Sequence, residues 1–150
     1  MTILLFVHIT CVLLSYAAFL LAFCSGLLFL LQERQLKHKR MGVLFHRLPA
    51  LDTLDRVNVR AIGWGFALLS VGILMGAIIG RRATGQWWND DPKVYGTAML
   101  WGLYLLLWLL RVRSALRGRK VAVLSVLGFG LVLVIWLGVN HALLLGPKAL

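Results

Sequence analysis

Four long apolar segments constrain this chain more than any other feature. The first, residues 3–31, has no charged residue and would form roughly 40 Å of helix at about 1.5 Å per residue, more than the roughly 30 Å hydrocarbon core of a bilayer requires. The others are residues 61–80, 95–110 and 121–145. Because the chain has 150 residues and is 61% hydrophobic, one soluble core could not bury its apolar surface. We therefore predict an all-α membrane protein with four transmembrane helices in a single domain, residues 1–150.

The basic residues predict the orientation of these helices. Twelve of the sixteen cations lie in two blocks between apolar segments, residues 32–60 and 111–120, and the positive-inside rule places both blocks in the cytoplasm. The other four are Arg81, Arg82, Lys93 and Lys148. We therefore expect both termini outside the cytoplasm, in a multi-pass protein of the bacterial inner membrane. Since topology accounts for the net charge of +11, we expect no nucleic-acid partner.

The first apolar segment could also be read as a signal peptide. No basic region precedes it, and no small-residue cleavage motif is evident before Glu33 and Arg34. We expect the segment to be retained as a membrane span.

The first basic block contains a short amphipathic turn. Residues 51–56 set two aspartates and an arginine against two leucines, a pattern typical of the membrane surface. The simplest interpretation of the charges in residues 32–60 is a solvated anchor that faces the lipid. We expect the two histidines of this block, His38 and His46, to be solvated.

Glycines recur along one side of the second apolar segment. Gly72, Gly76 and Gly80 are spaced four residues apart, so they form a ridge at which another helix, or a flat ligand, can approach the backbone. Helix packing is the more common use of such a ridge.

Two histidines and a tryptophan pair converge on the predicted outer face. His8 lies near the outer end of the first segment, His141 near that of the last, and Trp87 and Trp88 lie in the loop between the second and third. An imidazole in a bilayer is costly unless it is paired, ligates a metal or lines a cavity. Neutral imidazole suits haem iron, and aromatic side chains suit a flat macrocycle. The alternative is that these histidines are simply hydrated.

The remaining tryptophans have a structural explanation. Trp64, Trp101, Trp108 and Trp136 are typical of the aromatic belt at a membrane interface.

Few features favour enzymatic chemistry. Adjacent residues Asp90 and Asp91 would project in different directions, so they form no acid–base pair, and no nucleophile motif or phosphate-binding loop is present. Cys11 and Cys24 lie about 20 Å apart along one helix, too far for a disulfide. We expect a protein that is not an enzyme.

Short motifs along the whole chain match one known family in order and spacing. They are His8, Ser15-Tyr16-Ala17, Gln32-Glu33-Arg34, Leu48-Pro49, Leu54-Asp55, Gly65-Phe66, Gly72-Ile73, Trp88, Asp91-Pro92-Lys93, Trp101, Tyr104, Arg117-Gly118-Arg119, Gly128-Phe129 and Gly138-Val139-Asn140. On these residues the chain resembles the cytochrome c assembly membrane-protein family, which includes the haem-delivering synthase of system II cytochrome c maturation and the HemX-like proteins. Its members carry a tryptophan-rich haem loop that contains aspartate.

The resemblance implies that haem is held on the extracytoplasmic side, and we expect this haem to be of the b type. A histidine of the helix that matches the first segment is one axial ligand, which gives that role to His8. A second histidine follows the helix that matches the last segment, and His141 is the candidate for it. The tryptophan loop, with Trp87, Trp88 and Asp91, would lie against the ring.

The chain also departs from the family pattern. Asp90 stands where the fullest form of the loop has a second tryptophan, and Val94 stands where it has glutamate. The family's second histidine lies several residues beyond the Gly-Val-Asn motif, where this chain has Pro147 and Lys148.

These departures leave two hypotheses open. In the first, this is a haem-binding or haem-handling membrane protein of cytochrome c biogenesis. In the second, it is a degenerate member of the family that acts as a structural accessory subunit of a larger membrane complex for electron transfer. Either way, we expect membrane lipid and other membrane subunits as partners.

Overall fold

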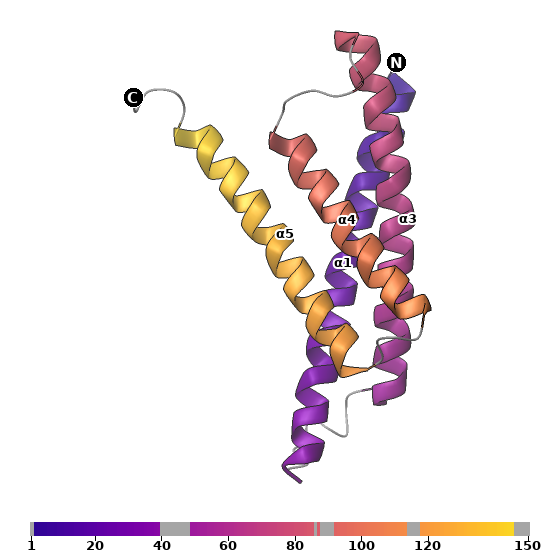
Figure 1. The fold of residues 1–150 in the computed structure, drawn as a ribbon, viewed down its shortest axis with the longest axis vertical. Helices are drawn as coiled ribbons and strands as arrows, with labels where there is room; N and C mark the ends of the chain where they lie inside the picture. Colours follow the sequence, from indigo (N-terminus) through magenta and orange to yellow (C-terminus); the bar gives the residue numbers. More distant parts are fainter. Residues whose placement is uncertain (1, 40–48, 86, 88–91, 114–117, 146–150) are drawn as a thin grey trace.

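Four helices make up the described part of the computed structural model (Figure 1). They are α1 (Thr2–Lys37), α3 (Leu51–Thr84), α4 (Pro92–Val112) and α5 (Arg119–Leu145). The structure describes residues 2–39, 49–85, 87, 92–113 and 118–145, with side chains from Val94 in α4 and up to Val134 in α5. Each predicted span lies inside one of these helices, so the prediction of an all-α protein is confirmed.

Length and composition support the prediction of membrane spans for three helices. Among the described residues, Thr2–Lys37, Leu51–Thr84 and Val94–Val112 are long and apolar enough to cross a bilayer. The protein is therefore a multi-pass membrane protein. A fourth span in α5, the single domain and the outward position of both termini stay predictions.

Helix α3 is longer than the predicted span, because the amphipathic turn is its beginning. It starts at Leu51, just after Pro49, and its first turn carries the exposed i,i+4 ion pair between Asp52 and Arg56. It ends at Gly85, whose φ of 76° is left-handed and whose N–H bonds the carbonyl of Arg81 at 2.8 Å. The turn is thus continuous with the membrane helix and is not a separate surface element.

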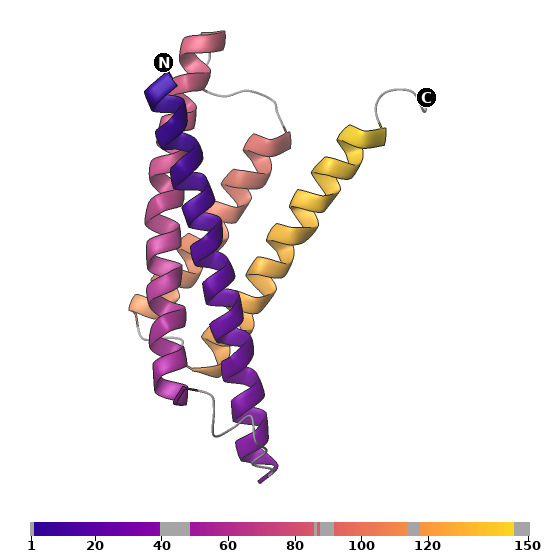
Figure 2. The same ribbon diagram turned by 180° about the vertical axis from the view of Figure 1, so that it is seen from behind.

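The helices pack most closely around the α1–α3 pair. Helices α1 and α3 run antiparallel and side by side over most of their length (Figures 1 and 2). Helix α4 packs on α3, while α5 packs on α1 and α4 near its own N-terminus and then diverges from α1. The bundle is therefore closed at the end where α5 begins and opens towards the end where α5 finishes.

A buried aromatic pair joins three helices at the centre. The rings of Phe19 in α1 and Tyr104 in α4 stack with centroids 3.6 Å apart, and neither residue is exposed. Gly65 of α3 makes room, because a Cβ there would lie 2.5 Å from the Phe19 ring. Leu69 and Val121 complete this core from α3 and α5.

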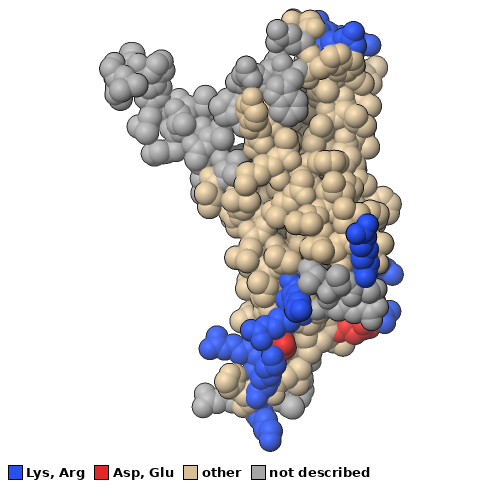
Figure 3. All heavy atoms as spheres, viewed as in Figure 1, with Lys and Arg blue, Asp and Glu red and all other residues tan. Residues whose placement is uncertain are grey.

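Charged side chains divide the molecule into two ends. Figure 3 shows most Lys and Arg gathered where α1 and α4 end and α3 and α5 begin, and we call this the basic end. A wide band without charge separates it from the far end, where α1 begins and α3 finishes with Arg81 and Arg82. This division is the one that the positive-inside rule uses to assign the cytoplasmic side.

Candidate functional site

His8 is held against the backbone of α3 near the far end. Its Nδ1 lies 2.7 Å from the carbonyl oxygen of Gly72, and the side chain is partly buried between α1 and α3. A carbonyl can only accept, so Nδ1 carries the proton and donates it. In the neutral imidazole the lone pair is then on Nε2, which has no hydrogen-bond partner among the described residues.

The glycine ridge of α3 makes this position possible. A Cβ on Gly76 would lie 2.9 Å from Cε1 of His8, and one on Gly72 would lie 2.9 Å from Val12 Cγ2. The prediction that the ridge packs against another helix is confirmed, and the helix is α1. What the sequence did not indicate is that the ridge also receives the ring of His8.

Trp87 lies beyond the end of α3. Its side chain is 59% exposed, and the guanidinium carbon of Arg81 lies 4.1 Å from the centre of its ring. From Gly76, which contacts His8, to the end of α3 at Thr84 is about 12 Å of helix at 1.5 Å per residue. Both residues are at the far end, but the structure does not bring them into contact.

The other predicted site residues cannot be placed at the level of side chains. Trp88 and Asp91 lie outside the described residues, as does His46 of the basic block. The backbone of His141 belongs to the last turns of α5, but its side chain is outside the described part. Those turns stand apart from α1 in both views (Figures 1 and 2). The pairing of His141 with His8 stays a prediction.

Trp101 joins α4 to α3 half a helical turn before Gly72, on a different face of α3. Its Nε1 donates to Ser70 Oγ at 2.8 Å, Ser70 donates to the carbonyl of Phe66 at 2.8 Å, and the rings of Trp101 and Phe66 pack with centroids 5.6 Å apart. Ser70 and Gly72 are two residues apart and therefore face different neighbours, α4 and α1. Trp101 is therefore more than a residue of the aromatic belt, because it also connects two helices. Trp64 is 69% exposed, as expected for a belt residue. The side chain of Trp136 is outside the described part.

At the basic end, a buried asparagine connects three helices. Asn58 of α3 is 2% exposed, and its Nδ2 donates to the carbonyl of Ala22 in α1 at 2.6 Å and to Ser125 Oγ in α5 at 2.9 Å. A Cβ on Gly26 would lie 2.7 Å from Ser125 Oγ, so this glycine lets the three helices meet. We call these four residues the polar junction: Ala22, Gly26, Asn58 and Ser125.

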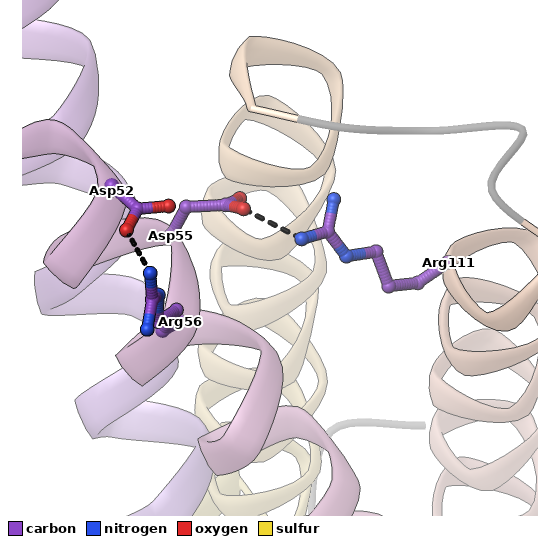
Figure 4. Close-up of polar contacts among 4 residues, drawn as sticks. All are labelled: Asp52, Asp55, Arg56 and Arg111. Carbon is purple, nitrogen blue, oxygen red and sulfur yellow. Dashed lines mark hydrogen bonds and ion pairs between the residues drawn. The ribbon is translucent and has the colours of Figure 1, made fainter.

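An ion pair next to the polar junction joins α3 to α4. Arg111 reaches across from α4, and its Nη2 lies 2.6 Å from Asp55 Oδ2 (Figure 4). Both side chains are less than one fifth exposed, whereas Asp52 and Arg56 on the same helix turn are mostly exposed. The expectation that residues 32–60 carry solvated charges is thus incomplete, because Asp55 serves as a contact between helices.

Comparison with known proteins relates this chain to one protein family. Residues 1–145 match the family described as Cytochrome C assembly protein. The cytochrome c biogenesis protein CcsA of Synechococcus elongatus is 40% identical over 94 residues, which are 63% of this chain and 29% of that protein. The protein of the same name from Crocosphaera subtropica is 36% identical over 116 residues, which are 77% and 35% of the two chains.

A longer match comes from Guillardia theta. Its cytochrome c biogenesis protein CcsA is 30% identical over 151 residues, covering 91% of this chain and 50% of that protein. The chain thus spans between about a third and a half of the length of these relatives. No solved structure matches the chain. Because the family match covers nearly all of the residues, this chain belongs to the cytochrome c assembly protein family.

Proposed function

We propose that this protein handles haem in cytochrome c assembly and holds it through His8 at the far end of the bundle. The family membership supports the involvement of haem, because relatives are named for cytochrome c biogenesis. The contact between His8 and Gly72 carries the assignment of the residue. The basic residues at the opposite end support an extracytoplasmic position for this site. We further propose that the membrane is the bacterial inner membrane.

The hydrogen bonding of His8 fits an axial ligand. Metal-bound histidines commonly donate their second ring N–H to a backbone carbonyl, which fixes the tautomer and orients the ring. His8 Nδ1 makes this kind of contact with Gly72, and Nε2 is the atom that would bind iron. When haem is bound, His8 would hold its iron through a neutral imidazole nitrogen, and we propose haem of the b type.

The surrounding residues would hold the ring of His8 and shield it. Gly76 lets the imidazole lie against α3 without a clash. The Trp101–Ser70 contact fixes α4 beside the same stretch of α3. We further propose that His141 supplies the second ligand, that Trp87, Trp88 and Asp91 line the macrocycle, and that the protein acts by binding haem and not as an enzyme.

Haem content of the purified protein tests this proposal. The protein is purified in mild detergent and analysed by its absorption spectrum and by a pyridine haemochrome assay. We expect a Soret band with haem close to one per chain in wild type, and a large loss in His8→Ala. His38→Ala is the matched control, because it removes a histidine that directly follows α1 at the basic end.

A wild-type protein free of haem would contradict the proposal. If that protein also copurified with a larger membrane assembly, the accessory-subunit hypothesis would take its place. His141→Ala in the same assay tests the second ligand, since its loss should shift the Soret band or lower the haem content if both histidines ligate.

A further inference from the structure

The last turns of α1 line a groove at the basic end that the haem site does not use. The groove is open to its surroundings, has a volume of about 590 Å³ and is lined, among the described residues, by Leu31, Arg34, Gln35 and His38. Leu31, Arg34 and Gln35 are spaced i, i+3 and i+4, so they share one face of α1, and His38 directly follows the end of the helix. A volume of this size is in the range of sites that hold small molecules.

The positive charge in this groove is not neutralised by the described part of the chain. The neighbouring acid, Glu33, interacts elsewhere, because its Oε1 lies 3.0 Å from Lys37 Nζ and its Oε2 lies 3.7 Å from Arg119 Nε. Arg34 has no acidic partner among the described residues. A guanidinium that lines a groove in this way favours an anionic ligand, and phosphate is one that it binds well.

Gln35 adds a second requirement. Its Oε1 is buried and has no hydrogen-bond partner in the described structure, so the side chain must turn towards the groove before a ligand can reach this atom. An amide oxygen only accepts, so a ligand that satisfies it must bring a donor such as a hydroxyl. A simple anion would meet the needs of Arg34 and leave those of Gln35 unmet.

The groove lies at the boundary between apolar and polar parts of α1. Leu31, the last apolar residue before the charged turns, is 42% exposed and lines the groove together with Arg34. Beyond it, Lys39 adopts a left-handed φ of 52°, and its N–H bonds the carbonyl of Leu36 at 3.2 Å. The helix therefore ends in a defined turn that keeps His38, whose N–H bonds the carbonyl of Arg34 at 3.1 Å, on the groove.

We propose that this groove binds an anionic phospholipid with a hydroxylated headgroup, of the phosphatidylglycerol class. The phosphate is held by Arg34 and His38, a glycerol hydroxyl donates to Gln35 Oε1, and an acyl chain follows Leu31 into the bilayer. The cations around the basic end raise the local concentration of such a lipid (Figure 3). Zwitterionic phosphatidylethanolamine fits less well, because its ammonium would lie beside Arg34. This site does not depend on the proposed haem function.

Native mass spectrometry of the detergent-purified full chain tests the proposal. Dioleoyl phosphatidylglycerol, phosphatidylethanolamine and phosphatidic acid are titrated separately, and the fraction of lipid-bound protein is measured. We expect wild type to retain phosphatidylglycerol best and Arg34→Gln to bind it roughly tenfold more weakly, the loss expected for a charge-assisted contact. Lys37→Gln is the matched control, because it removes a cation three residues away that lies in the Glu33 ion pair.

Gln35→Leu separates a specific site from simple charge attraction. This variant keeps Arg34, so it should still bind anionic lipid but should lose the preference for phosphatidylglycerol over phosphatidic acid. Circular dichroism of each variant checks that the helices are retained, and variants that lose helicity are replaced by Arg34→Lys and Gln35→Glu.

Three results would overturn the proposal. Equal weakening by Arg34→Gln and Lys37→Gln would mean a diffuse charge effect. Unchanged preference in Gln35→Leu would mean that the hydroxyl is not recognised. Displacement of phosphatidylglycerol by millimolar inorganic phosphate would mean a site for free phosphate and not for a lipid.

Discussion

The two ends of this bundle are built by different means. At the basic end, side-chain hydrogen bonds and an ion pair connect all four helices, through the polar junction and through Asp55 and Arg111. At the far end, the α1–α3 pair depends on glycines and on one histidine against a carbonyl, while α5 diverges. We infer that the basic end holds the helices together, whereas the far end leaves the side chain of His8 available to a ligand.

Crowding the polar junction should have the largest effect on stability. In Gly26→Val, the new side chain would collide with Ser125 Oγ, Asn58 Nδ2 and the carbonyl of Ala122, which lie 2.7, 3.0 and 3.1 Å from an ideal Cβ. We expect the free energy of unfolding, measured by titration with sodium dodecyl sulfate in mixed micelles, to fall by about 3 kcal/mol. Gly102→Val is the control, because nothing lies within 4 Å of a Cβ there. Equal effects would contradict the role of the polar junction.

Removing the ion pair between α3 and α4 should have the next largest effect. Asp55→Asn leaves the charge of Arg111 in a site where both side chains are less than one fifth exposed, and we expect a loss of about 2 kcal/mol. Asp52→Asn, on the same turn, removes a carboxylate that is 70% exposed and should cost about 0.5 kcal/mol or less. The same titration compares the two variants. A similar loss in both would mean that the Asp55–Arg111 pair stabilises the protein no more than an exposed ion pair does.

Asn58→Ala should weaken the bundle more modestly. It removes hydrogen bonds to α1 and α5, and because buried hydrogen bonds between membrane helices are worth about 0.6 kcal/mol each on average, we expect a loss of about 1 kcal/mol in the same titration. A double-mutant cycle with Ser125→Ala isolates the contact between the two side chains. Strict additivity of the two variants would show that this contact is not formed in the membrane protein.

The smallest effect on unfolding is expected at the far end. Ser70→Ala removes the acceptor of Trp101 Nε1, at a cost of about 0.5 kcal/mol. Because the lost contact holds α4 against α3 at the far end, the same variant should perturb the Soret band of a haem held by His8, whereas Asn58→Ala, at the basic end, should not. A Soret band that changes in Asn58→Ala but not in Ser70→Ala would contradict the placement of the haem site at the far end.

The helices could be predicted from the sequence, because uncharged apolar runs have few alternatives to a membrane helix. The glycine ridge at Gly72 and Gly76 predicted close helix packing, because residues without a side chain let another helix approach the backbone. Its partner could not be predicted, since spacing along one helix does not reveal which helix approaches. The positions of Asn58 and Asp55 were missed because they lie in a basic stretch that suggests solvated charge. These residues are largely buried because α3 begins as early as Leu51 and packs them against the other helices.

The sequence indicated that His8 needs a partner, whereas its role in a haem site stays a prediction. His8 stood out because an imidazole in an apolar helix needs a partner, and the structure supplies one in Gly72. The hydrogen bond itself has no local signal, since the carbonyl belongs to a residue 64 positions away. His8 and Trp87 are separated along the axis of α3 because this helix continues beyond Gly76 to Thr84. The predicted span ended at Gly80 and was therefore too short.

Chemical rescue of a His8→Gly variant tests the central claim most directly. The absorption spectrum of the purified variant is recorded before and after addition of imidazole, beside wild type and His38→Gly. If His8 is an axial ligand, the Soret band should be lost or shifted in His8→Gly, restored by imidazole, and unchanged in His38→Gly. A wild-type Soret band in His8→Gly without imidazole would contradict the assignment of His8 and leave its contact with Gly72 as a packing feature.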